Sequence, residues 1–285
     1  MATPKEVKEN LEMISTVKNV TATYQEIANL RMKQVREKVL KNREFFKELL
    51  DIYQRVKSAH LFSFKKSWLR KKRVSFRRAE KGKVIVFLSA NQFFYGALIL
   101  DIWKEIQNHL KKDRTDLAVV GRTGKYLVER SGFGNKMFYF ELDDVKPEED
   151  KIKGIVEFIK NYKKIFVFHG KYEKVLFQKT VISEISGKLP LEEENLTTEE
   201  EIKTYIFEPS PEEILDFFET EIIAALFNQT ILEHQLARYA SRVIAMYQAT
   251  ENAKNLEKNL STIKNKLERQ KLNKKQIELL SSLEL

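Results

Sequence analysis

The sequence of 285 residues contains no cysteine, which excludes disulfide bonds, thiolate metal sites and cysteine nucleophiles. Helix-breaking residues are also scarce, with nine glycines and five prolines in the whole chain. Long apolar runs are missing as well. The stretch Val84–Leu88 has the length of a strand, whereas a membrane-spanning helix needs about 20 apolar residues. Neither a transmembrane segment nor a signal peptide is therefore expected.

The few glycines and prolines are unevenly placed. All nine glycines lie between Gly82 and Gly187, and the only proline outside Pro147–Pro211 is Pro4. Because glycine and proline interrupt helices, the two ends of the chain are predicted to form long helices. The middle is predicted to form a domain with turns.

The amino-terminal helix has a clear start signal. Thr3, Pro4 and Glu6 form a capping box with proline at the first helical position. The helix is predicted to run to about Ala59, a length of roughly 80 Å. Its apolar residues follow the three- and four-residue steps of a coiled coil: Val7, Leu11, Ile14, Val17, Val20, Tyr24, Ile27 and Leu30.

The carboxy-terminal segment is predicted to be a second long helix. Ser210, between Pro209 and Pro211, is the expected cap, and no glycine or proline follows from Glu212 to Leu285. Heptad-like steps connect Tyr239, Val243, Met246, Ala253, Leu256, Leu260, Ile263 and Leu267, with Ala249 or Thr250 filling one gap. Each long apolar stripe needs a covering partner. The simplest partner is the other end of the chain, with residues 11–30 lying antiparallel to residues 243–267.

The middle of the chain alternates strand and helix patterns. Strands are predicted over 83–88, 117–120, 137–140 and 165–168, and helices over 94–110, 123–130 and 148–161. This order predicts a small Rossmann-like α/β domain with a largely parallel sheet. Edge strands are expected over 175–185 and 205–207, and the acidic stretch Glu192–Glu201 is expected to be a loop.

The fold class is thus α/β, with a long antiparallel coiled coil of the terminal helices and an inserted α/β domain. The predicted boundaries are a coiled-coil helix over 1–60, a basic linker over 61–82, the α/β domain over 83–208 and a coiled-coil helix over 209–285.

One segment requires comparison with a phosphate-binding loop. Gly121-Arg122-Thr123-Gly124-Lys125 follows a predicted strand and opens a predicted helix. A P-loop would have glycine at the position of Val119 and serine or threonine at the position of Tyr126. A tight strand-to-helix turn is therefore the preferred interpretation.

The net charge of +10 is compatible with an acidic partner surface, nucleic acid or a solvated lysine-rich helix. Lys65–Lys83 holds ten basic residues together with Trp68 and Phe76. Basic residues interleaved with aromatics can bind a nucleic-acid backbone. A linker, or a basic face for an acidic protein, is the favoured reading, and nucleic-acid binding stays as an alternative.

No catalytic, metal or cofactor residues are predicted. His60, His109, His169 and His234 lack metal-ligand spacing. The neighbours Glu233 and His234 are expected to point to different helix faces, so they are not a dyad. An enzyme that uses the α/β domain remains a third hypothesis, which would require nucleotide or metal bound to the purified chain.

The carboxy-terminal helix carries a specific resemblance. Arg242–Ala253 reads R-V-I-A-M-Y-Q-A-T-E-N-A and resembles the signature R-x-x-A-M-x-x-A-T-x-N-A of the gamma subunit of F-type ATP synthases. Arg269-Gln270, followed by Ile277, is similar to the R-Q-x-x-I-T-x-E-I ending of that family. Val119–Gly124 resembles the V-I-G-R-K-G turn, and Glu208–Asp216 resembles the segment that enters the last helix.

Other family elements are altered. The S-D-R-G-L-C-G-G element corresponds to Ser89–Gly96, of which only the ends are kept, and the S-E-H before the signature reads Ala237-Arg238-Tyr239. The K-A-M-x-M-V-A-A-x-K run is largely lost around Tyr24–Lys33. Such drift is similar to that in the F-type-like ATPases of mycoplasmas. The alternative is therefore a shaft for a dedicated ATP-hydrolysing motor, such as gliding or surface machinery.

The resemblance implies a non-catalytic central rotor shaft that transmits torque within a hexamer of alpha-like and beta-like ATPase subunits. It also implies an epsilon-like subunit, a membrane ring or other driven element, one copy per complex, no nucleic acid, and a peripheral position at the cytoplasmic face of the cell membrane. The residues expected to contact the catalytic subunits are Arg242, Met246, Arg269, Gln270, Ile277, Leu279 and Leu280.

Overall fold

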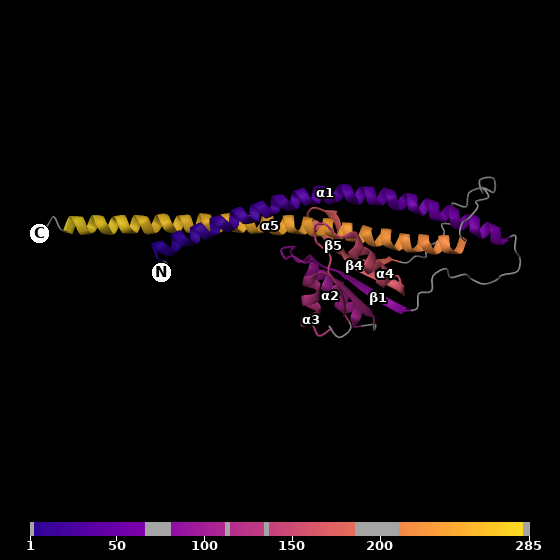
Figure 1. The fold of residues 1–285 in the computed structure, drawn as a ribbon. Coiled ribbons are helices and arrows are strands. Elements are labelled where there is room, and N and C mark those ends of the chain that lie inside the picture. The colour runs from indigo at the N-terminus through magenta and orange to yellow at the C-terminus, as the bar shows by residue number, and fades with distance from the viewer. Residues whose placement is uncertain (1–2, 66–80, 112–114, 134–136, 186–210, 282–285) are drawn as a thin grey trace.

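The computed structural model describes residues 3–65, 81–111, 115–133, 137–185 and 211–281. Two helices dominate it, α1 (Pro4–Lys65) and α5 (Pro211–Ser281), of 62 and 71 residues. At 1.5 Å per residue they are about 90 Å and about 105 Å long. They run antiparallel, with the α/β domain against one side of α5 (Figure 1). The predicted coiled coil with an inserted domain is confirmed.

The amino-terminal capping box forms as the sequence indicates. The Thr3 N–H donates to Glu6 Oε2 at 2.8 Å, and the Glu6 N–H donates to Thr3 Oγ1 at 3.3 Å. The other end of α1 differs, because the helix continues to Lys65 rather than ending near Ala59. The first strand begins at Lys81. Helix and strand therefore both extend into the predicted linker, and its residues 66–80 lie outside the described part.

The contact seam of α1 differs from the predicted stripe after Ile14. The buried and half-buried positions alternate steps of four and three along the helix: Val7, Leu11, Ile14, Lys18, Thr21, Gln25, Ala28, Met32, Val35 and Val39. The predicted residues Val17, Val20, Tyr24 and Ile27 are each one position away and 41–48% exposed.

Polar pairing and the packing further along α1 explain this shift. Lys18 Nζ lies 2.6 Å from Glu257 Oε2, and the Thr250 hydroxyl donates to Thr21 Oγ1 at 2.8 Å. Val35 and Val39 pack against Leu232 and Leu236 of α5 and so fix the phase of the seam. Two stripes of α1 have heptad spacing, and spacing alone cannot choose between them.

The α5 seam agrees better with the prediction. Tyr239, Met246, Thr250 and Ala253 are buried, and Leu260 and Leu267 are half-buried. Leu256 and Ile263 were wrong choices, since they are 52% and 45% exposed. The seam positions predicted for Leu256 and Ile263 are instead taken by the half-buried Glu257 and Lys264.

The domain alternates strands and helices in the predicted order: β1 (Lys81–Leu88), α2 (Leu98–Leu110), β2 (Asp116–Val120), α3 (Arg122–Arg130), β3 (Met137–Phe140), α4 (Glu149–Ile159), β4 (Tyr162–Lys174) and β5 (Phe177–Ile185). The sheet order is β3-β2-β1-β4-β5. The first four strands are parallel, and β5 pairs antiparallel with β4 at the edge. The largely parallel sheet and its edge strand are confirmed.

Within the domain, two elements differ from their predicted bounds by more than two residues. Helix α2 starts at Leu98 instead of Phe94, because Phe94 and Gly96 have φ of 70° and 58°, which a right-handed helix excludes. Strand β4 continues to Lys174 and forms a hairpin with β5. The predicted strand 205–207, the loop 192–201 and the cap Ser210 lie outside the described residues.

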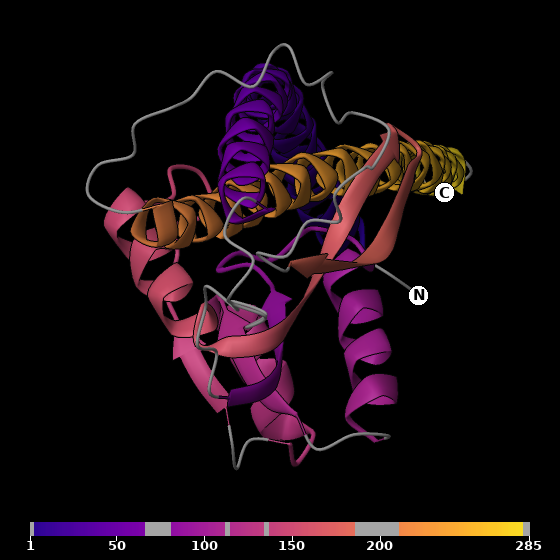
Figure 2. The ribbon, with the colours of Figure 1, turned by 90° about the vertical axis from the view of Figure 1, so that its right-hand side faces the viewer.

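The sheet packs on both faces, and α5 contributes to both cores, to the second through Ala237. Val84 and Val86 of β1 share a cluster with Ile223, Phe227 and other residues of α4 and α5. The alternate residues of β1 face α2 and α3. The first half of α5 therefore lies between α1 and the sheet (Figure 2).

Candidate functional site

The seven residues predicted to contact partners fall into two groups along α5. Arg242 and Met246 are only 6% and 7% exposed. The other five lie on the last turns of α5, which extend beyond the start of α1 (Figure 1): Arg269, Gln270, Ile277, Leu279 and Leu280, all exposed.

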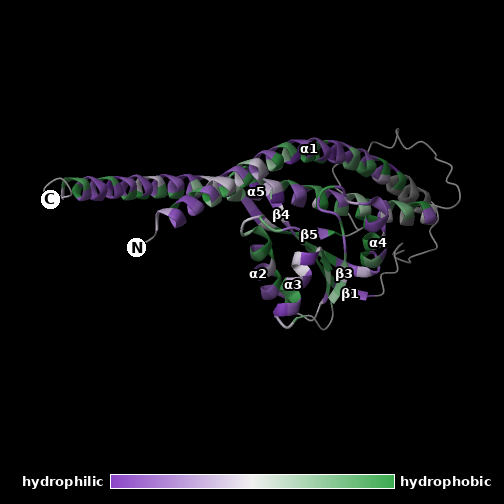
Figure 3. Cartoon of the chain, turned by 60° about the vertical axis from the view of Figure 1, so that its left-hand side comes forward, coloured by the Kyte–Doolittle hydropathy of each residue, from purple (hydrophilic) through white to green (hydrophobic). Residues whose placement is uncertain are grey.

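The extended end of α5 mixes hydrophilic and hydrophobic residues along its length (Figure 3). Its apolar residues remain accessible, since Ile277 is 66% exposed and Leu280 is 65% exposed. Large exposed apolar side chains along a bare helix are typical of a protein-binding segment. In the described residues, no helix is long and apolar enough to cross a membrane.

Arg242 is held by contacts within the chain. Its Nη2 donates to the Phe93 carbonyl oxygen at 2.9 Å and to Gln92 Oε1 at 3.3 Å. The guanidinium lies over the Tyr95 ring, 4.0 Å from its centroid. Burial raises the pKa of Tyr95 to about 12, so this phenol stays neutral. Arg242 thus fastens the loop after β1 to α5, and a contact with a partner stays a prediction for this residue.

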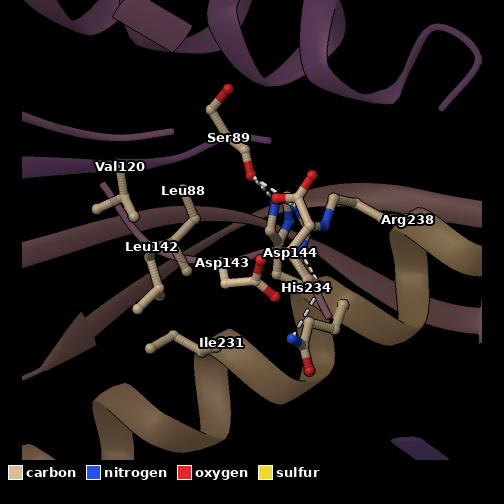
Figure 4. Close-up of a pocket in the computed structure, with 10 residues that line it drawn as sticks. Leu88, Ser89, Val120, Leu142, Asp143, Asp144, Ile231, His234 and Arg238 are labelled. Carbon is tan, nitrogen blue, oxygen red and sulfur yellow. Dashed lines mark hydrogen bonds and ion pairs between the residues drawn. The ribbon is translucent and has the colours of Figure 1, made fainter. Parts of the chain in front are cut away.

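A buried ion pair lies one helical turn before Arg242. Arg238 Nη1 is 2.6 Å from Asp144 Oδ1, and the two side chains are only 6% and 5% exposed. Burial opposes the charged guanidinium, yet the pKa of Arg238 is raised, and the Asp144 carboxylate is the largest of the causes that raise it. Asp144 also accepts the backbone N–H groups of Asn91 and Gln92 at 3.0 Å. The carboxylate therefore joins α5 to the segments that follow β3 and β1 (Figure 4).

His234 connects two strands of the sheet. Its Nδ1 accepts the Gly170 N–H at 3.0 Å, so the opposite nitrogen, Nε2, donates to the Ser89 carbonyl oxygen at 3.0 Å. Burial, together with the positive charge of Arg238, lowers the pKa of His234 well below its usual value. The neutral ring is thus a structural bridge in which both nitrogens are used.

The predicted separation of Glu233 from His234 is confirmed. Glu233 Oε1 lies 3.0 Å from Arg43 Nη2 of α1, whereas His234 bonds to Gly170 of β4 and to Ser89. The two neighbouring side chains therefore serve the two surfaces that α5 joins. In the described residues, no group of three or more histidine, aspartate or glutamate side chains could hold a metal ion.

The turn at Gly121–Lys125 is explained by close packing. Gly121 has φ of 102°, and a Cβ there would lie 2.9 Å from the backbone nitrogen of Ala90. A Cβ on Gly124 would lie 2.7 Å from the side chain of Ser89. Both glycines let α3 start tightly against the segment after β1, so the predicted strand-to-helix turn is confirmed.

Sequence reasoning missed the cluster of His234, Arg238 and Asp144. A signal was available in the polar residues placed at steps of three and four among buried apolar ones, His234, Gln235, Arg238, Ser241 and Arg242. Their partner could not be found that way, because Asp144 is 94 residues from Arg238.

Comparisons with known proteins agree with this architecture. A family model described as ATP synthase matches residues 3–284. The "ATP synthase gamma chain" of Actinobacillus succinogenes is 22% identical over 277 residues, which cover 93% of each chain. That of Ruthia magnifica is 23% identical with the same coverage.

Solved structures have the same fold. A chain from the central stalk and c-ring of Tetrahymena thermophila mitochondrial ATP synthase has a TM-score of 0.58 and 17% identity, covering 81% of this chain and 99% of that one. A chain from Euglena gracilis mitochondrial ATP synthase has a TM-score of 0.54 and 16% identity, covering 88% and 93%. With a family match over nearly the whole length, this chain belongs to the gamma-subunit family of ATP synthases.

Proposed function

We propose that this chain is the central rotor shaft of an F-type rotary ATPase, a non-catalytic subunit that transmits torque. The observation that carries the proposal is the paired α1–α5 shaft, whose α5 end continues alone with exposed apolar residues. Such an end fits a bearing inside a ring of partner subunits. Family membership favours this function over nucleic-acid binding. That alternative rests on the basic stretch Lys65–Lys83, of which residues 66–80 lie outside the described part.

An exposed apolar stripe on one side of α1 would make the contact between the shaft and its surroundings asymmetric. Met13, Val17, Val20, Tyr24 and Ile27 form an exposed apolar stripe on α1. It continues to the domain through Tyr24, whose ring centroid lies 6.4 Å from that of Phe94. Exposed apolar stripes mark protein interfaces. Because the stripe covers only one side of α1, the shaft presents different surfaces to its surroundings at different angles.

This asymmetry gives a mechanism for coupling. A surrounding hexamer of alpha-like and beta-like subunits has several open and closed arrangements. Each shaft angle would favour the arrangement that its surface contacts best, which is a shift of populations by differential contact. ATP hydrolysis in the hexamer would then turn the shaft. Conversely, an external torque on the shaft would drive the hexamer through the same arrangements in reverse order. The contacts at the free end of α5 would be made by Arg269, Gln270, Ile277, Leu279 and Leu280. Two further contacts with the catalytic subunits, nearer the α/β domain, would involve Arg242 and Met246.

The remaining partners follow from the same proposal. One copy of the chain would join an epsilon-like subunit and a membrane ring or another driven element, peripheral to the cytoplasmic face of the cell membrane. A dedicated ATP-hydrolysing motor would use the same shaft with another driven element.

Reconstitution tests the proposal. The tagged chain should co-purify with alpha-like and beta-like ATPase subunits, and a bead on its domain should rotate when ATP is added to the immobilised complex. Calorimetry should detect magnesium-ATP binding only after the catalytic partners are added. Micromolar binding by the free chain, abolished by Lys125→Ala, would instead support an enzyme or nucleotide-binding domain.

A further inference from the structure

The α/β sheet has a topological switch point between β1 and β4. The chain proceeds from β1 to β2 and β3 on one side, whereas β4 lies on the other side of β1. In open α/β sheets, the crevice at the carboxyl ends of the two diverging strands is where ligands usually bind. In this protein α5 lies directly against that position, next to Ser89 and His234 (Figure 4).

Side chains of α5 fill that crevice. His234 bridges Ser89, which follows β1, and Gly170 of β4 through both ring nitrogens. The cavity beside this bridge is lined by α5, the ends of β1 and β2 and the segment after β3, and it has a volume of about 20 Å³. That space is enough for one water molecule and too small for a nucleotide or other organic ligand. The usual ligand site of the fold is therefore occupied by the protein's own helix.

Further hydrogen bonds from α5 reach the segments after β1 and β3. Arg238 donates to the Ser89 carbonyl oxygen at 3.2 Å, to the Asp144 carboxylate at 2.6 Å and to the Asp144 carbonyl oxygen at 3.3 Å. Gln235 donates to that same carbonyl oxygen at 3.1 Å. Ser241 donates to the Tyr95 carbonyl oxygen at 2.6 Å. These bonds hold α5 from several directions around the same edge of the sheet.

The backbones also approach closely at this edge. A Cβ on Gly96 would lie 2.9 Å from the hydroxyl oxygen of Ser241, and one on Gly170 would lie 3.1 Å from the Cβ of Ala237. Further toward the start of α5, the contact with the sheet is made by apolar residues such as Ile223 and Phe227. Apolar packing is non-directional. Hydrogen bonds need defined distances and angles, so the polar cluster resists rotation of α5 about its own axis.

We propose that this cluster, His234, Gln235, Arg238, Ser241 and Arg242 with Asp144, is a clamp that makes α5 and the α/β domain turn as one body. Arg238 is the central positioning residue, since it bonds to the segments after β1 and β3 together. The clamp rests on the proposed shaft function and extends it by assigning where torque passes between the coiled coil and the domain.

The first experiment measures torsional stiffness in the assembled, immobilised complex. A bead is attached through Lys104→Cys on α2 of the otherwise cysteine-free chain, and its angular fluctuations are recorded during the pauses before ATP binds. Charge-assisted hydrogen bonds are about twice as strong as neutral ones, so Arg238→Met should raise the angular variance roughly 1.5- to 2-fold. The control Arg43→Met, which breaks the ion pair with Glu233, should leave the variance unchanged.

A paired variant separates stiffness from stability. Arg238→Leu with Asp144→Leu replaces the buried ion pair by apolar side chains, an exchange that is often neutral for stability. The clamp predicts that this variant assembles and is still torsionally softer, because apolar contacts lack direction. A variant that assembles with wild-type variance would overturn the clamp.

A second experiment uses the free chain, without partner subunits. Spin labels at Lys104→Cys and Gln248→Cys report the distance between α2 and α5, whose distribution should broaden in both Arg238 variants and stay unchanged in Arg43→Met. Equal widths in all variants would overturn the clamp. A wild-type chain that neither assembles nor rotates would overturn the shaft function. The distance measurement on the free chain would still test the clamp in that case.

Discussion

At the residue scale, several side chains fill two structural roles at once. Asp144 neutralises Arg238 and also fixes the backbone of Asn91 and Gln92. Arg238 lies in the triplet that replaces the family's S-E-H, and Asn91 lies in the altered S-D-R-G-L-C-G-G element. Two segments that depart from the family's motifs, 147 residues apart in the chain, therefore meet at one carboxylate.

Two glycines allow a matched test of backbone constraint. Gly121 has a positive φ, and a Cβ there would meet the backbone of Ala90, whereas Gly154 in α4 has nothing within 4 Å. Gly121→Ala should destabilise the chain by about 2 kcal/mol or more, and Gly154→Ala should stabilise it by roughly 1 kcal/mol. Urea unfolding of the two variants measures both effects. Similar values would mean that the turn at Gly121 adapts to a side chain.

His234 should make stability depend on pH. Its folded-state pKa is lowered by burial, so the unfolded chain takes up the proton first as the pH falls. The contribution to stability is then complete above the unfolded pKa of about 6.5 and is lost below it. Between pH 6.5 and 5.5 the free energy of unfolding should fall about 1 kcal/mol more in the wild type than in His234→Gln.

Urea titrations at the two pH values measure that difference. His169 contributes in the same direction, because burial lowers its pKa too, so some slope should persist in the variant. His109→Gln is the control, since the His109 side chain is 43% exposed. Equal slopes in the wild type and His234→Gln would show that folding does not lower the pKa of His234.

At the scale of elements, the shaft is an antiparallel pair whose seam alternates apolar and polar layers. Val35 and Val39 pack against apolar residues of α5, while Thr21 and Lys18 pair with Thr250 and Glu257. A polar pair in a seam stabilises less than an apolar one but specifies the register. The polar layers thus favour a single alignment of α1 on α5.

The register predicts which cysteine pairs will crosslink. Thr21 Oγ1 and Thr250 Oγ1 are 2.8 Å apart, which places the two Cβ atoms within reach of a disulfide. Thr21→Cys with Thr250→Cys should form an intramolecular disulfide rapidly, because the chain has no other cysteine. Glu26→Cys with Thr250→Cys, which starts from an exposed α1 residue, should not. Non-reducing gels check the result, and crosslinks only between separate chains would contradict the intramolecular shaft.

At the scale of the whole molecule, α5 passes through three different surroundings along its length. Its first half lies between α1 and the sheet, its middle pairs with α1, and its end extends alone (Figure 1). The buried part holds the polar clamp and the free end has the exposed apolar side chains. One continuous helix can therefore connect a domain to a distant tip without a joint.

The tip residues should matter only in the assembly. Arg269→Ala with Gln270→Ala should lower the ATPase turnover of the complex, because polar contacts to a partner can contribute about 1 kcal/mol or more each. The free chain should unfold at an unchanged temperature, since exposed polar residues add little to helix stability. Turnover and melting measurements check both, with the exposed Lys258→Ala as control. Unchanged turnover and assembly would remove both residues from the proposed contacts.

The sequence by itself determined the elements and their order. The absence of glycine and proline from both ends predicts two long helices, and alternating short apolar runs predict the α/β domain, because helix breaking and periodicity are local properties of the backbone. The capping box at Thr3 and the turn at Gly121 were predictable for the same reason.

Only the tertiary structure decided how these elements meet. The stripe through Val17 and Tyr24 has the same spacing as the seam through Lys18 and Gln25. The choice depends on pairing with Glu257 and Thr250, which lie more than 200 residues away. The clamp is equally non-local, because Arg238 is stable in the interior only when the fold places Asp144 against it. Side-chain partners far apart in sequence are set by packing, and no local pattern encodes them.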